Sequence, residues 1–160
     1  MRGRRMTLIL AVLTLLVLAL SIPGSLREAY ERGGLYLFSR EFFEDLPKRL
    51  AGAGRFRFLL QPVMAAAIGI AAGRSDARAG KTPFLYAVLF RAEDRAALFR
   101  SSVESIAHIL LMGILVDAVC QWILLGVSYP GAALVVGPVL IATPYAVARS
   151  LANRFTTATS

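Results

Sequence analysis

An acidic side chain, Asp117, stands near the middle of an apolar run that covers residues 106–127. A run of about 20 apolar residues is long enough to cross the hydrocarbon core of a bilayer. A carboxylate at mid-span costs roughly 2.5–3.5 kcal/mol on the insertion scale, so we expect it to face protein or water rather than lipid. Gly113, Asp117 and Gln121 follow one another at intervals of four residues and therefore share one stripe of the predicted helix.

Two interpretations of Asp117 are open. An ionisable residue inside a span is by default a functional-site hypothesis, and such residues often belong to a proton or ion path. In the other interpretation, Asp117 and Gln121 form hydrogen bonds to neighbouring helices and set their register. Because no second carboxylate and no basic partner is apparent within any predicted span, the sequence favours the structural role.

His108 is the single histidine of the chain. It precedes Asp117 by nine residues, which places the two on opposite helix faces and about 13 Å apart along the axis. We therefore interpret His108 as a hydrogen-bonding residue near the end of the span; a bis-histidine haem site would need a second chain. Since the chain also has one cysteine, Cys120, the sequence predicts no cofactor, no multi-histidine metal site and no Ser-His-Asp set.

The composition is that of a membrane protein rather than a nucleic-acid-binding one. The chain has 160 residues, 57% hydrophobic content and a formal net charge of +8, and its mean hydropathy is +0.63. The basic residues lie in the segments between apolar runs, as membrane topology requires, and do not form one long basic patch.

The apolar runs predict an all-α integral membrane fold with four transmembrane helices, in a single membrane domain over residues 1–160. The predicted spans cover residues 6–22, 56–72, 106–127 and 132–148, and amphipathic interfacial connectors cover residues 25–54 and 83–100. The first run is either an uncleaved signal anchor, which its length favours, or a cleavable signal peptide. Pro23-Gly24 is expected to end it. Whether residues 56–72 fully span is left open, because this run is short.

Both connectors contain a predicted amphipathic helix. In the first, Leu35, Phe38, Phe42 and Leu46 recur at spacings of three and four, and Pro47 is expected to stop the helix. This helix either lies on the membrane surface or packs on its own neighbours. In the second, one helix is predicted over residues 83–100, too charged to span and therefore lying along the interface.

Small residues predict where helices approach closely. Ala65, Gly69 and Gly73 form a ridge on the second span, and we expect the third span, which carries Gly113, to pack against it. The loop predicted at residues 73–81 contains two glycines and a lysine but lacks the spacing of a Walker loop. It either contacts a phosphate or lipid headgroup, or is a plain loop in which Asp76 pairs with Arg74 or Arg78.

The distribution of Lys and Arg predicts the threading. With four spans and a cytoplasmic N-terminus, 11 of the 18 basic residues fall on the cytoplasmic side. The turn at residues 128–131 has no charge and belongs on the other side. We therefore expect both termini in the cytoplasm.

Several short motifs occur together between residues 55 and 155. They are Arg55-Phe56-Arg57 with Gln61-Pro62, Ser75-Asp76-Ala77-Arg78-Ala79-Gly80, Asp117-Ala118-Val119 with Gln121, Tyr129-Pro130-Gly131-Ala132-Ala133-Leu134, and Pro144-Tyr145. In this combination the chain resembles a family of small bacterial inner-membrane proteins of unknown function. The resemblance does not cover the first span or the first connector. It implies a bacterial inner-membrane location and lends no activity, substrate or catalytic residue.

Three classes of function compete. The first is a non-catalytic polytopic membrane protein, an accessory or assembly subunit that contacts the bilayer and other membrane proteins or copies of itself. The alternative is a small transporter or channel with Asp117 in an ion or proton path. The third, an intramembrane enzyme, lacks a convincing set of catalytic residues. The sequence favours the first class.

Overall fold

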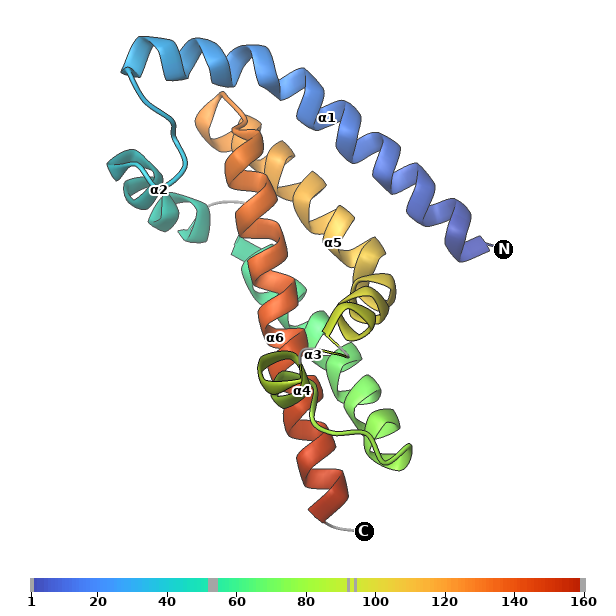
Figure 1. The fold of residues 1–160 in the computed structure, drawn as a ribbon. Helices are drawn as coiled ribbons and strands as arrows, with labels where there is room; N and C mark the ends of the chain where they lie inside the picture. Colours follow the sequence, from blue (N-terminus) through green and yellow to red (C-terminus); the bar gives the residue numbers. More distant parts are fainter. Residues whose placement is uncertain (1, 52–54, 92, 94, 159–160) are drawn as a thin grey trace. The chain divides into compact units, whose positions relative to one another are not determined.

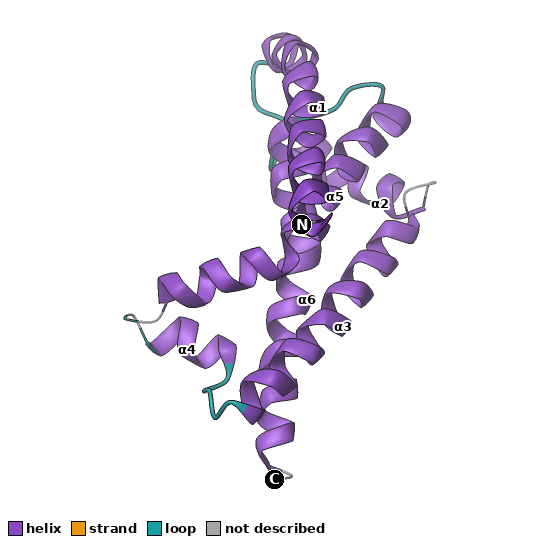
Figure 2. Cartoon of the chain, turned by 90° about the vertical axis from the view of Figure 1, so that its right-hand side faces the viewer, coloured by secondary structure: helices purple, strands orange, loops and turns teal. Residues whose placement is uncertain are grey.

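The computed structural model describes residues 2–51, 55–91, 93 and 95–158, and the regular structure in these ranges is helical. Six helices are labelled in Figure 1, and Figure 2 shows no strand in the described part of the chain. They are α1 (Arg2–Arg32), α2 (Arg40–Ala51), α3 (Arg55–Arg78), α4 (Phe84–Phe90), α5 (Arg95–Leu125) and α6 (Pro130–Ala158).

Four of these helices are long and apolar enough to cross a membrane. The candidate spans are Arg5–Arg32, Arg55–Arg78, Arg95–Leu125 and Pro130–Ala158. The predicted all-α membrane fold with four apolar helices is therefore confirmed. The helix that contains residues 56–72 has 24 residues and meets the length for a span.

The chain divides into two compact units. Unit 1 comprises Met1–Leu59 and Leu110–Val139, and unit 2 comprises Leu60–Ile109 and Leu140–Ser160. Helices α3, α5 and α6 contribute residues to both. The expectation of a single membrane domain stays a prediction.

In unit 1, α1 runs beside the part of α5 that belongs to this unit (Figure 1). The Thr14 hydroxyl lies 2.7 Å from the carbonyl oxygen of Leu10 and 3.3 Å from that of Leu111 on α5. Val17 and Leu18 pack against a buried group that includes Ile114. The buried side of α1 is therefore narrow, and most of its large apolar side chains are exposed.

The expectation that Pro23-Gly24 ends the first helix is wrong, because α1 continues through Pro23 to Arg32. A proline inside a helix removes one hydrogen bond and bends the helix, and here it does not terminate it. The Ser25 hydroxyl donates to the carbonyl oxygen of Ile22, 3.0 Å away, and so binds a carbonyl beside the proline. Gly33, with a φ of 71°, then ends the helix in the left-handed region.

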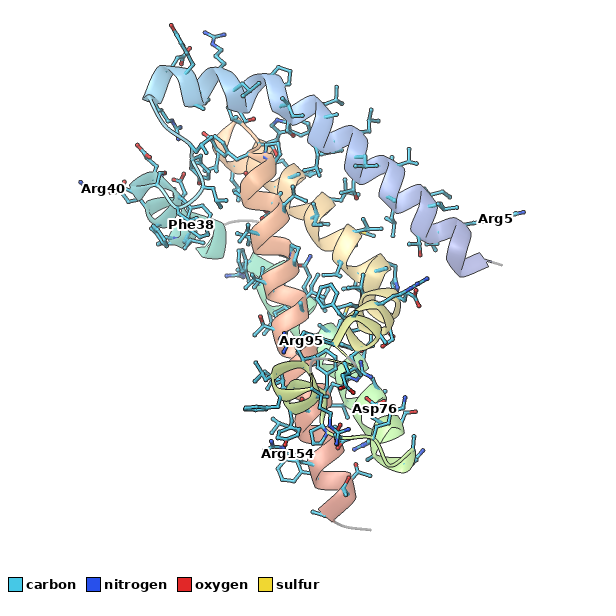
Figure 3. The ribbon with its side chains drawn as sticks, viewed as in Figure 1. Arg5, Phe38, Arg40, Asp76, Arg95 and Arg154 are labelled. Carbon is cyan, nitrogen blue, oxygen red and sulfur yellow. The ribbon has the colours of Figure 1, made fainter. Side chains whose placement is uncertain are left out.

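Helix α2 differs from its prediction at both ends. It begins at Arg40 because Phe38 has a φ of 63° and Ser39 caps the helix, its Oγ accepting a hydrogen bond from the backbone N–H of Phe42 at 3.2 Å. Figure 3 shows Phe38 and Arg40 at the start of α2. Helix α2 continues through Pro47 to Ala51, so the expected stop at Pro47 is wrong. A single proline removes only one backbone donor, and Pro47 is exposed, so its ring does not disturb the buried side of the helix.

The apolar side chains of the predicted α2 stripe have different environments. Phe42 is buried and Leu46 packs on the same cluster, which also contains Tyr36, Tyr129 and Ala132. Leu35 and Phe38 are exposed. Part of this stripe therefore packs on its own neighbours, as one of the two interpretations expected.

In unit 2, α3 and α6 cross at the ridge of small residues. A Cβ at Gly69 would lie 3.2 Å from the Cβ of Ala148, and one at Gly73 would lie 2.9 Å from the Cβ of Ala152 and against the Arg149 carbonyl oxygen. Only glycine allows the backbones to approach this closely. At Gly69 and Gly73 the ridge contacts α6, not the expected third span.

The connector after α3 was also predicted wrongly in its boundaries. The expected loop at residues 73–81 is helical as far as Arg78, and Gly80 then turns the chain with a φ of 64°. The expected single helix over residues 83–100 is instead α4, which ends at Phe90, and the first turns of α5, which begins at Arg95. Arg91 adopts an extended backbone conformation and so interrupts the helix.

Candidate functional site

Asp117 lies in a buried polar network of unit 1. It is 0% exposed and forms an ion pair with Arg57 of α3, which is itself 7% exposed. On its other side, the Gln121 side-chain amide donates to Asp117 Oδ2 over 2.7 Å. The predicted stripe thus brings Asp117 and Gln121 together, and Arg57 neutralises the charge that made Asp117 costly inside a span.

Gln121 connects this ion pair to the turn between α5 and α6. Its Oε1 accepts a hydrogen bond of 2.8 Å from the backbone N–H of Tyr129. That turn begins at Gly126, which has a φ of 74°, and the carbonyl oxygen of Tyr129 in turn accepts from the N–H of Ala133 at the start of α6. Both the nitrogen and the oxygen of the Gln121 amide are therefore hydrogen-bonded, so the Arg57–Asp117 pair, α5 and the turn stabilise one another.

Sequence reasoning missed Arg57 as the partner of Asp117. Arg57 lies at the start of the predicted span over residues 56–72, so the expectation that no basic partner stands within a span is wrong. Two sequence observations pointed to Arg57. Arg57 directly precedes a long apolar run, and Asp117 was a charge in need of compensation. The pairing itself depends on which helix ends meet, and helical periodicity does not contain that information.

An aromatic group lies beside the α5–α6 turn in unit 1. The rings of Tyr36 and Tyr129 stack with centroids 3.7 Å apart, and the Arg32 guanidinium lies 5.6 and 5.5 Å from the two centroids. The Tyr36 hydroxyl donates to Asp45 of α2 at 2.9 Å. Burial raises the pKa of the Tyr129 hydroxyl, and Arg32 opposes part of that rise. The group ties the end of α1, α2 and the turn together.

A second buried network, in unit 2, is centred on Arg149 of α6. Its Nε donates to Asp76 Oδ2 on α3 over 2.6 Å, and its Nη1 donates to the Ser102 hydroxyl of α5 at 2.8 Å. Nη1 also lies 3.1 Å from the Tyr145 hydroxyl, and the guanidinium stands 4.8 Å from the ring centroid of Phe84 on α4. One arginine therefore contacts residues from all four helices that contribute to this unit.

Neighbouring residues of α6 hold the first turn of α4 and the segment before it. The Ser150 hydroxyl oxygen accepts a 2.7 Å hydrogen bond from the backbone N–H of Leu85, which has no partner within its own helix. The Asn153 side chain donates to the carbonyl oxygen of Lys81 at 3.0 Å. The expected local pairing of Asp76 with Arg74 or Arg78 is wrong, because its partners are Arg149 and, at 3.6 Å, Lys81.

The other predicted residues lie outside these two networks. The His108 side chain is exposed and makes no hydrogen bond or ion pair with another described residue. Gly113 is buried and meets Gly137 of α6 within unit 1, where a Cβ on Gly137 would lie 3.1 Å from the Gly113 carbonyl carbon. Ala65 is 0% exposed, consistent with a packing role, and Cys120 is a free thiol. Among the described residues, no three His, Cys, Asp or Glu side chains gather to hold a metal ion.

The fold and the two networks define a class of protein. The protein has four apolar helices that are long enough to cross a membrane, and the buried pairs Arg57–Asp117 and Arg149–Asp76 lie within them. These are the features of a multi-pass membrane protein. Comparison with family models, curated proteins and solved structures finds no match to this chain.

Proposed function

We propose that this protein is a non-catalytic accessory or assembly subunit of a membrane complex, located in a bacterial inner membrane with both termini in the cytoplasm. The observation that carries the proposal is the burial of Asp117 and its contacts. The one acidic residue in the middle of a predicted span is 0% exposed, ion-paired to Arg57 and hydrogen-bonded to Gln121. These contacts support a role for Asp117 in positioning helices.

The second buried pair supports the same conclusion. Asp76 and Arg149 are 7% and 6% exposed, and Arg149 contacts three other helices of its unit. In this proposal α1 is retained as an uncleaved anchor, because Thr14 is buried and its hydroxyl contacts the carbonyl oxygen of Leu111 on α5. The exposed apolar surface of the helices is then available to lipid and to partner proteins.

The test is a pull-down of the tagged native protein in mild detergent, with mass spectrometry of the captured proteins and a mass estimate of the particle. We expect a stoichiometric set of other membrane proteins. A homo-oligomer that conducts ions or protons in liposomes would overturn the proposal and favour the transporter alternative.

A paired variant separates the two functions. In Arg57→Met/Asp117→Asn both charges are removed together, so no buried charge is left without compensation. An accessory subunit should keep its partners in this variant. A transporter that uses Asp117 should instead keep its fold and lose ion or proton flux in liposomes.

A further inference from the structure

A cavity of about 550 Å³ lies within unit 2, beside the turn at residues 80–82, α4 and the first turns of α5. Its apolar wall is formed by Phe84 and Ala87 of α4 and by Ala97 and Leu98 of α5. Lys81 and Arg91 also line it, and both are exposed. The cavity therefore combines an apolar wall with two accessible cations, and its size is typical of small-molecule sites.

The charges around the cavity favour an anion. Asp76 is the one carboxylate among the described residues that line the cavity, and it is held by Arg149 at 2.6 Å. The Lys81 ammonium stands 3.6 Å from Asp76, a loose contact that leaves its other donors accessible. Arg91 makes no ion pair with another described residue. An anion in this cavity would meet two cations and a carboxylate that is already neutralised.

The position of the cavity specifies the kind of anion. The connector that carries Lys81 and Arg91 joins two candidate spans, one ending at Arg78 and the other beginning at Arg95. The ends of spans lie at the level of the lipid headgroups. Helix α4 also exposes Leu89 and Phe90, as expected of a short helix that lies at the lipid boundary.

We propose that this cavity binds an anionic phospholipid. Its phosphate would contact Lys81 and Arg91, and the upper part of an acyl chain would lie along the wall formed by Phe84, Ala87 and Leu98. Basic pockets between membrane helices are a recurrent form of lipid recognition. The inference does not depend on the proposed subunit role.

The experiment titrates dioleoylphosphatidylglycerol into the purified full chain in a neutral detergent and counts bound lipid by native mass spectrometry. We expect tighter binding than for dioleoylphosphatidylcholine, which has no net charge. The variant Lys81→Gln/Arg91→Gln should bind phosphatidylglycerol about thirtyfold more weakly, since each basic residue near the surface contributes about 1 kcal/mol. Both side chains are exposed, so we expect the variant to keep its fold.

A matched control removes two cations from unit 1. Arg27→Gln/Arg40→Gln makes the same change in net charge, and the two side chains are 81% and 90% exposed. It should bind phosphatidylglycerol nearly as tightly as the native chain. Equal losses in the two double variants would mean non-specific attraction to the whole protein, and would overturn the proposal.

Two further measurements distinguish a lipid from a free phosphate. Ala97→Phe narrows the apolar part of the cavity and leaves both cations in place, so it should weaken the binding of phosphatidylglycerol. Inorganic phosphate should displace the lipid poorly. Full displacement by phosphate, together with unchanged lipid binding in Ala97→Phe, would show a simple phosphate site and refute a lipid site.

Discussion

The ion pair between Arg57 and Asp117 allows a prediction in which two mutations together do less damage than either alone. In Asp117→Asn, the new side-chain oxygen can still accept the hydrogen bond from Gln121, which is 2.7 Å long in the native chain. What is lost is the negative charge, and Arg57, 7% exposed, stays buried and uncompensated. Breaking a buried pair in this way costs about 3–5 kcal/mol.

The opposite single mutation breaks the same pair. Arg57→Met leaves the Asp117 carboxylate buried without its cation, and removing one partner of a buried pair is strongly destabilising. The double variant leaves neither charge, and Met can fill part of the space of the arginine stem. Replacing a whole buried pair by neutral groups is often close to neutral for stability. We therefore expect the double variant to be more stable than either single variant.

The assay is reversible unfolding in mixed micelles with increasing denaturing detergent, followed by helical circular dichroism, for the native chain and the three variants. Glu104→Gln serves as a control, because it breaks an ion pair whose side chains are 83% and 67% exposed, and it should have little effect. Additive losses in the double variant would show that Arg57 and Asp117 do not interact, and the proposed role of the network would then be wrong.

Two further predictions concern packing and pH. Gly73→Ala should lower the thermal stability in detergent by more than the roughly 1 kcal/mol typical of a point mutation, because the new Cβ would meet the Arg149 carbonyl oxygen. Gly34→Ala is the control and should have little effect, because the space around Gly34 is open. The pKa of Tyr129 is raised from 10.0 by burial, so its stabilising contribution is fully present below pH 10.0 and is lost as pH rises through the folded-state value. Tyr129→Phe should therefore show a shallower loss of stability in the alkaline range than the native chain; an identical pH dependence in both proteins would contradict the assignment.

The parts of the fold that were predicted from the sequence are those determined by local pattern. Four apolar runs predicted four long helices, because a segment without polar side chains must satisfy its backbone internally in lipid. The spacing of Asp117 and Gln121 predicted one stripe, and the two side chains are hydrogen-bonded. The ridge at Gly69 and Gly73 was identifiable as a close approach because glycine leaves its helix surface open.

The errors at helix ends have one physical origin. The sequence predicts that Pro23 and Pro47 end helices, yet both lie inside helices. Proline removes a single donor, and the remaining hydrogen bonds and the packing of the flanking turns outweigh that loss in α1 and α2. Helix ends are weakly encoded locally, and the true ends at Gly33 and Arg91 are set by backbone conformations.

The sequence by itself determined the helical class of this protein, its membrane character and the short-range stripe that carries Asp117. Tertiary structure alone decided which charges are compensated. Arg57 and Asp117 come from different helices, and Asp76 and Arg149 are 73 residues apart. A helix repeats every 3.6 residues, so its pattern states which side chains share a face but not which other helix covers that face. Whether each buried charge has an oppositely charged partner is therefore decided by the packing of helices that are distant in sequence.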